Sequence, residues 1–207
     1  LGVEIEEHEH TVYDLMAEEA GLDECLVKNV QDNLDVLPSD MNLAGAEIEF
    51  QEIENKETLL KRYLDQVRDD YDFILIDCPP SLNILTINAL TAADTVLVPI
   101  QCEYYALEGL NQVLKTVELV RKKLNPQLEL EGVVFTMYDA RTNLSMQVVE
   151  NVKDHLNQKV YKTMIPRNIR LAEAPSYGMP INLYDAKSAG AESYMALADE
   201  VIKRKGI

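Results

Sequence analysis

An unbroken apolar run near the middle of the chain constrains the fold more than any other feature. Phe73 to Ile76 are consecutive apolar residues that lead directly into Asp77. An apolar run without alternation is typical of a strand that is buried on both faces, as in the middle of a parallel sheet. Pro79 and Pro80 follow and withdraw two backbone donors, so the strand is expected to end at Asp77.

Asp77 therefore stands at the carboxyl end of the predicted strand, which is the edge where open α/β sheets bind ligands. A carboxylate at this edge can hold a magnesium ion, or the water bound to it, against a nucleotide phosphate. A strand-terminal Asp that only caps the next turn explains the same short pattern equally well. The run alone leaves both explanations open.

Other elements alternate along the chain in the manner of βαβ units. Strands are predicted over residues 34–37, 73–77, 95–99, 130–136 and 160–165, and helices over 12–20, 43–48, 57–67, 84–92, 107–124, 144–156 and 191–203. Thr11 and Asn42 are the expected N-caps of the first two helices. The sequence thus predicts an α/β fold with a mostly parallel twisted sheet flanked by helices. No linker-like segment interrupts it, which indicates a single domain over residues 1–207.

Charge is distributed unevenly along the chain. The net charge is −17, and residues 1–70 alone hold 20 acidic and 5 basic side chains. Tight nucleic-acid binding through overall charge is therefore not expected, although a local basic patch on the remaining residues is compatible with this balance.

Cysteine usage and hydropathy indicate a cytoplasmic protein. Cys25, Cys78 and Cys102 are widely spaced and form no CxxC pair, which argues against a zinc site or a disulfide framework. No apolar stretch approaches the roughly 18 residues that a membrane span requires. The sequence also shows no signal peptide, that is, no basic segment followed by an apolar one. Neither export nor a membrane partner is therefore expected.

Seven segments along the chain form a pattern that is more specific than any single motif. They are TVYDLM, LDVLPSDMNLAGAEIE, DFILIDCPPSLNILTINAL, VPIQCEYYALEGL, FTMYDARTNLSMQVVENV, VYKTMIPRNIRLAEAPSYGMPINLYD and GAESYMALADEV. In this order they closely resemble the ParA/Soj family of chromosome- and plasmid-partitioning ATPases, and the resemblance covers the entire chain. It implies a P-loop NTPase fold of the deviant Walker A type, with ATP and Mg²⁺ as cofactors. It also implies an ATP-dependent homodimer that binds DNA non-specifically at the nucleoid, and a ParB-like centromere-binding partner that stimulates hydrolysis.

One family motif is absent from these residues. The family carries a phosphate loop, KGGxGKTT, on its first strand, but no glycine here is followed by Lys-Ser or Lys-Thr. We therefore expect an amino-terminal truncation of about 40–50 residues, enough for a strand, a loop, a helix and a second strand. The full-length parent protein is expected to be an ATP hydrolase. The present chain is expected to lack the first strands of that fold and to be inactive.

The resemblance assigns a nucleotide site to five residues. Asp77 resembles the Walker B aspartate, which holds Mg²⁺ through water. Met137, Pro166, Arg167 and Asn168 follow two later strands, and by resemblance they line the adenine pocket, where an apolar wall and amide hydrogen bonds suit a base. A plain turn or cap role for Asn168 is the alternative.

The resemblance also assigns a surface for DNA. Arg141 and Arg170 match positions that form a non-specific DNA-binding surface in Soj-type members, a role that suits guanidinium groups facing phosphates. Without the family, two solvated arginines at helix starts would explain them. Tyr104 and Tyr105 resemble a segment near the dimer interface, and packing explains them equally well.

Two other functions compete with the partitioning ATPase. A non-catalytic interaction or DNA-binding domain would explain the absent phosphate loop. A MinD-like ATPase of division-site placement would use a basic amphipathic terminal helix on lipid, whereas residues 193–202 have the pattern of a packing helix.

Overall fold

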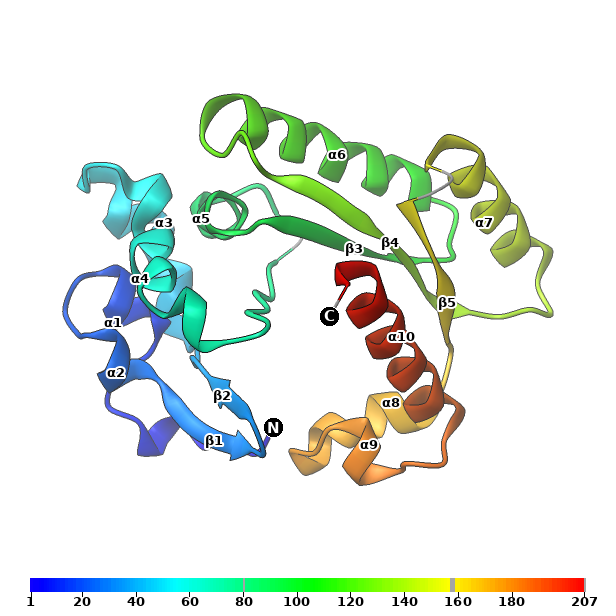
Figure 1. Ribbon diagram of the computed structural model, residues 1–207, viewed down its shortest axis with the longest axis horizontal. Coiled ribbons are helices and arrows are strands. Elements are labelled where there is room, and N and C mark those ends of the chain that lie inside the picture. Colours follow the sequence, from blue (N-terminus) through cyan, green and yellow to red (C-terminus); the bar gives the residue numbers. More distant parts are fainter. Residues whose placement is uncertain (80, 157–158, 207) are drawn as a thin grey trace. The chain divides into compact units, whose positions relative to one another are not determined.

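The computed structural model describes residues 1–79, 81–156 and 159–206. Pro80, which was predicted with Pro79 to end the strand over residues 73–77, lies outside the described residues. The chain divides into two compact units (Figure 1). The first unit is formed by Leu1–Asp94 with Glu118–Leu128, and the second by Thr95–Val117 with Glu129–Ile207. The single domain predicted over residues 1–207 stays a prediction.

A parallel sheet organises the second unit. Its strands are β3 (Thr95–Gln101), β4 (Glu129–Tyr138) and β5 (Val160–Pro166), in that spatial order. The crossovers contain α6 (Ala106–Lys123) and α7 (Asn143–Leu156), and the shorter helices α8 (Ile169–Glu173) and α9 (Ile181–Tyr184) precede α10 (Ala189–Lys205). The predicted α/β class with a parallel sheet and flanking helices is confirmed.

Both faces of this sheet are buried. On one face, Val133 and Phe135 of β4 pack with Val152 of α7 in a cluster that also holds side chains of β3 and α6. On the other face, Val134 joins Tyr161 and residues of α10, including Leu197. Successive residues of β4 thus point to opposite, equally apolar faces, which is why its sequence is a continuous apolar run rather than an alternating one.

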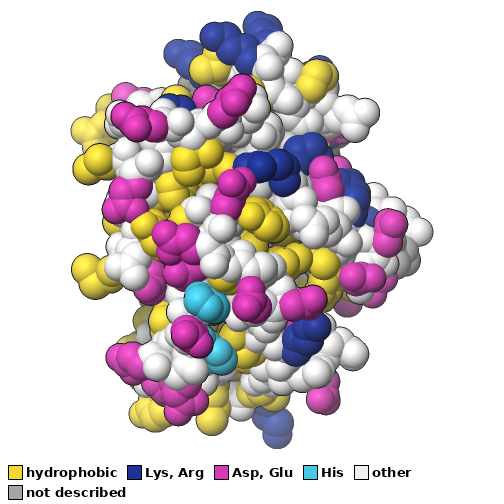
Figure 2. Space-filling model, turned by 90° about the vertical axis from the view of Figure 1, so that its left-hand side faces the viewer, with side chains coloured by type: hydrophobic (Ala, Val, Ile, Leu, Met, Phe, Trp, Pro, Cys, Tyr) yellow, Lys and Arg dark blue, Asp and Glu magenta, His cyan; other side chains and the backbone are white. Residues whose placement is uncertain are grey.

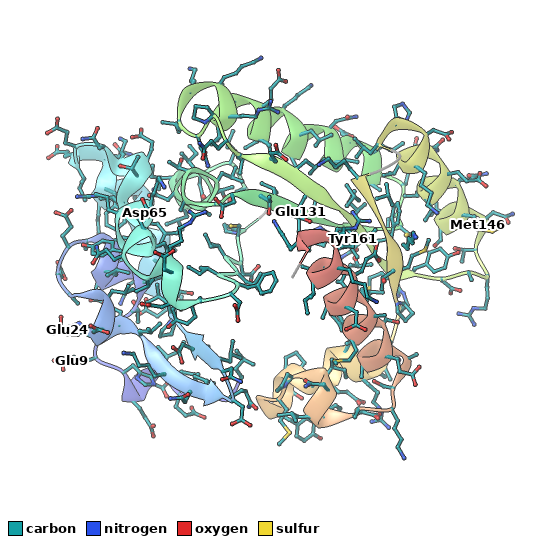
Figure 3. The ribbon with its side chains drawn as sticks, viewed as in Figure 1. Glu9, Glu24, Asp65, Glu131, Met146 and Tyr161 are labelled. Atoms are coloured by element: carbon teal, nitrogen blue, oxygen red, sulfur yellow. The ribbon has the colours of Figure 1, made fainter. Side chains whose placement is uncertain are left out.

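A polar cluster ties α10 to the ends of β4 and β5. The hydroxyl of the fully buried Tyr161 donates to Glu131 at 3.1 Å, and Lys205 lies 2.8 Å from the same carboxylate (Figure 3). The guanidinium of Arg204 lies over the Tyr161 ring, 3.7 Å from its centroid. Burial alone would raise the pKa of Glu131, but Lys205, Tyr161 and Thr95 hold it below its usual range.

Glu200 of α10 satisfies the outer edge of β5. Its carboxylate accepts from the backbone N–H of Lys162 at 2.9 Å, and from the N–H and hydroxyl of Thr163 at 2.9 Å each. Arg204 donates to the same carboxylate at 2.8 Å. A helix side chain therefore takes backbone hydrogen bonds that a further strand would otherwise take.

The first unit is mostly helical. Its elements are α1 (Val12–Met16), α2 (Leu22–Cys25), the antiparallel hairpin β1 (Val27–Gln31) and β2 (Leu34–Val36), α3 (Ala46–Glu49), α4 (Leu59–Val67) and α5 (Ile84–Ala92). Its core is formed by Met16, Ala46, Phe50 and Leu59. Acidic side chains recur across the face of the molecule drawn in Figure 2.

One predicted helix cap is confirmed and one is wrong. The Thr11 hydroxyl accepts from the backbone N–H of Tyr13 at 3.2 Å, as an N-cap does. The second helical segment begins with a 3-10 turn at Met41, and its cap is Asp40, whose carboxylate accepts from the N–H of Asn42 at 3.0 Å. Asp40 has the extended backbone that an N-cap needs, which explains why the helix starts before Asn42.

The buried strand predicted over residues 73–77 is wrong. Phe73 and Ile74 are 38% and 39% exposed and Leu75 is 90% exposed, and none of the strands in the described residues pairs with this segment. A strand forms only where a neighbour takes its backbone hydrogen bonds, so an apolar run alone does not make one. None of the described helices is long and apolar enough to cross a membrane.

Candidate functional site

The carboxyl ends of the three parallel strands lie at one edge of the sheet. The backbone N–H of Cys102, just after β3, donates to the carbonyl of Thr136 on β4 at 3.2 Å. The N–H of Arg167, just after β5, donates to the carbonyl of Tyr138 at 3.2 Å. The pairing therefore continues past the strands, and the loops that follow them begin side by side.

This edge brings together the four residues predicted to line the base pocket. Tyr138 is in register with Pro166, so that Met137 lies beside the segment of Pro166, Arg167 and Asn168. Met137 is 38% exposed and has a φ of 52°, in the left-handed region. Such a backbone costs a non-glycine residue about 1–3 kcal/mol, and residues of this kind cluster at ligand sites and switch regions.

Two of these four residues already have partners in the chain. Arg167 lies 3.6 Å from Glu103, and both side chains are more than half exposed, so the pair contributes little to stability. The side-chain oxygen of Asn168 accepts from the N–H of Arg170 at 2.8 Å and caps α8. The cap role is thus present in the structure, and contact of Asn168 with a base stays a prediction.

Arg141 is bound to an acidic side chain two residues before it. Its Nε and Nη2 donate to the two carboxylate oxygens of Asp139, at 2.9 and 2.7 Å, and its backbone N–H donates to the same carboxylate at 3.0 Å. These hydrogen bonds hold the pKa of Asp139 well below its usual range. Arg141 is therefore more than a solvated side chain at a helix start.

Arg170 lies between two carboxylates. Its Nη1 donates to Glu173 at 2.8 Å, and its Nε lies 3.4 Å from Asp185. The hydroxyl of Tyr184 donates to the same oxygen of Glu173 at 3.2 Å. The side chain of Arg170 is half exposed, so one side of its guanidinium remains open to solvent.

Asp77 belongs to the first unit, whereas the other six candidates belong to the second. It is exposed and lies between α4 and α5, outside the described helices and strands. Among the residues that the structure describes, no three or more His, Cys, Asp or Glu side chains are grouped to hold a metal ion. The water-mediated contact of Asp77 with magnesium therefore stays a prediction.

Reasoning from the sequence missed the carboxylates that pair with the two arginines, namely Asp139, Glu173 and Asp185. Two of these pairs had local signals: a turn-forming Asp commonly accepts from the N–H two residues later, and residues three apart on a helix, such as Arg170 and Glu173, are neighbours. Tyr104 and Tyr105 are 79% and 72% exposed, so packing within the described residues does not account for them.

Comparison with known sequences gives strong matches over almost the whole chain. A family model described as an AAA domain matches residues 1–130. The sporulation initiation inhibitor protein Soj of Bacillus subtilis is 56% identical over 201 residues, which are 97% of this chain and 79% of Soj. The chromosome partitioning protein ParA of Caulobacter vibrioides is 49% identical over 207 residues, 99% of this chain and 78% of that protein.

Solved structures resemble this one with similar coverage. Cobyrinic acid a,c-diamide synthase of Mycobacterium smegmatis, with bound ADP and magnesium, has a TM-score of 0.81 at 35% identity and covers 96% of this chain and 74% of its own. The cell division ATPase MinD of Pyrococcus furiosus has a TM-score of 0.74 at 25% identity, over 95% of this chain and 76% of that one. On the sequence matches, the chain belongs to the ParA/Soj family of partitioning ATPases.

Proposed function

We propose that the protein acts in chromosome or plasmid partitioning as an ATPase that binds ATP with Mg²⁺, dimerises with nucleotide bound, and binds DNA without sequence preference. The observation that carries this proposal is the 56% identity to Soj over 97% of the chain. The nucleotide and the ion are supported by the structural relative with bound ADP and magnesium.

The base would lie against the edge formed by the loops after β4 and β5. Met137 supplies a partly exposed apolar side chain at this edge, next to the last residue of β4. Pro166 and Arg167 supply backbone carbonyls beside it. A flat base suits such a place, because it needs one apolar wall and a few fixed hydrogen-bonding groups.

The phosphates and the metal need other groups. Asp77 carries an exposed carboxylate that fits a water-mediated magnesium ligand. The 207 residues include no Gly-Lys-Ser or Gly-Lys-Thr sequence, whose lysine and backbone amides would hold the phosphates. We therefore assign the base and the ion to these residues and assign no step of phosphoryl transfer to them.

DNA would be bound through local arginines rather than through net charge. Arg141 is 88% exposed and Arg170 is 50% exposed, and both lie in the second unit. Guanidinium forks bind phosphate oxygens at any base sequence, which gives affinity without sequence reading and would place the protein at the nucleoid. Residues 1–70, with 20 acidic and 5 basic side chains, would have to face away from the DNA.

The dimer would involve the exposed pair Tyr104 and Tyr105. Their rings stack edge to face, with centroids 5.1 Å apart. Exposed aromatic side chains are enriched where proteins meet, because they bury much area with little loss of conformational freedom. A ParB-like protein would bind the nucleotide-bound dimer and stimulate hydrolysis.

The test of the DNA assignment is the double variant R141A/R170A. We expect its affinity for a labelled duplex at low salt to fall about tenfold or more, since two phosphate contacts are lost. Binding of a fluorescent ATP analogue should stay unchanged. The control is R121A, which removes an exposed arginine of α6 that is not among the candidate residues. An unchanged DNA affinity of the double variant would remove the DNA assignment.

The two competing functions are separated by other measurements. A MinD-like role would need a helix on lipid, and α10 is not free for this role because its Leu197 and Val201 pack against Tyr161 in the core. Vesicle co-sedimentation of the chain should therefore show no binding. A non-catalytic domain would bind DNA equally well with and without ATP, whereas the proposed ATPase should bind it more tightly with ATP.

A further inference from the structure

The structure contains a feature that the proposed function does not use: each arginine proposed for DNA is held by carboxylates of its own chain. Arg141 donates through Nε and Nη2 to both oxygens of Asp139. This planar edge is the one that best fits two phosphate oxygens. Arg170 is paired with Glu173 and lies near Asp185. Neither arginine therefore presents an uncompensated positive charge in this state.

The two members of the first pair differ in how firmly they are held. The side chain of Asp139 is 23% exposed, whereas that of Arg141 is 88% exposed. Asp139 is fixed in its turn, because its carboxylate also accepts from the backbone N–H of Arg141 and its carbonyl accepts from Thr142 through both N–H and hydroxyl. The guanidinium can swing outward, and the carboxylate stays behind at the base of the loop.

We propose that Asp139 competes with nucleic-acid phosphate for the Nε/Nη2 edge of Arg141 and thereby sets how tightly the chain binds DNA. This inference rests on the proposed function of Arg141. A phosphate that takes this edge has to displace the carboxylate and then lies beside it, so that like charges repel. Since exposed ion pairs are weak, the displacement is reversible, and Asp139 lowers the affinity without blocking the site.

The substitution D139N tests the competition. Asparagine keeps the side-chain oxygen that accepts from the N–H of Arg141, so the turn is retained, but it carries no charge. We expect the variant to bind a labelled duplex about two- to fivefold more tightly than the wild type, the range that release of an exposed ion pair allows. The matched control is E150Q, which removes the same charge from an exposed position of α7 and should change the affinity less.

A double-mutant cycle separates this proposal from the one on which it rests. In the R141A background, D139N should give no gain, because the arginine that Asp139 occupies is absent. If D139N binds as the wild type does or more weakly while R141A weakens binding, Asp139 positions the arginine and the competition is refuted. If R141A alone leaves the affinity unchanged, the DNA role of Arg141 fails and the competition fails with it. Thermal unfolding of each variant verifies that the fold is kept.

Discussion

The close packing of Gly132 on β4 against residues 159–161 allows a sharp prediction about this glycine. A Cβ built on this glycine would lie 2.6 Å from the backbone carbonyl oxygen of Lys159 and 2.8 Å from the ring of Tyr161. Ordinary contacts of a Cβ begin at 3.4 Å, so both distances are too short. Tyr161 is fully buried and the other atom is backbone, so neither can move aside without separating β4 from β5.

We expect G132A to destabilise the fold by about 1–3 kcal/mol, the usual penalty of overpacking a core. For a chain of this length, this corresponds to a fall in the unfolding midpoint of about 2–12 °C. The measurement is thermal unfolding followed by circular dichroism, with urea unfolding at one temperature for the free energy itself. The slope of the urea transition should remain that of the wild type, because the surface exposed on unfolding hardly changes.

The matched control is G109A in α6, where a new Cβ would meet nothing within 4 Å. Alanine in an open helix position gains about 1 kcal/mol over glycine, so the midpoint should rise by about 2–4 °C. The same substitution should thus have opposite signs at two positions of one unit. A midpoint of G132A equal to or above that of the wild type would refute the spacing of β4 and β5 described above.

Two further predictions concern polar side chains that hydrogen-bond backbone groups. Asn88 is fully buried, accepts from the N–H of Leu60 and donates to the carbonyls of Lys56 and Ile84, so N88A should lower the free energy of unfolding by about 1–3 kcal/mol in urea, with the exposed N111A as the control. Burial would raise the pKa of Glu200, but the N–H groups of Lys162 and Thr163 and the guanidinium of Arg204 hold it below the usual 4.5. Its contribution to stability is therefore present above about pH 4.5 and is lost as the pH falls through the lowered pKa, so the unfolding midpoint of E200Q should depend less on pH in that acidic range than that of the wild type or of the exposed E192Q. Parallel acid dependence of all three proteins would contradict this assignment.

The elements that sequence reasoning predicted well are those whose pattern is local. The helix expected over residues 84–92 has these bounds in the structure, and the strands expected over 95–99, 130–136 and 160–165 lie inside β3, β4 and β5. The hairpin of the first unit was half missed, because β1 is largely polar. A usable signal was present in the two-residue loop Asp32-Asn33, because Asp and Asn are turn residues; Asn33 has a φ of 60°, which Asn tolerates.

For the candidate site too, the sequence predicted some features and missed others. That the loops after β4 and β5 would lie together followed from the parallel sheet, since carboxyl ends of parallel strands share one edge. The carboxylates that hold Arg141 and Arg170 did not follow, because such pairs depend on where each side chain points and, for Asp185, on a contact between residues far apart in the chain. The run over 73–77 shows the limit of pattern alone, since its apolar residues do not specify a neighbouring strand.

The charges of the chain suggest why binding of DNA and dimerisation would belong together. One chain carries a net charge of −17 and offers two proposed phosphate contacts, each of them compensated by carboxylates. A single copy should therefore hold DNA weakly and lose it readily as salt rises. Two copies joined by nucleotide would double the contacts, and the second pair would bind at the high effective concentration that the first creates. The salt dependence of DNA binding should then be about twice as steep with ATP as without it. Equal slopes would show that dimerisation does not add DNA contacts.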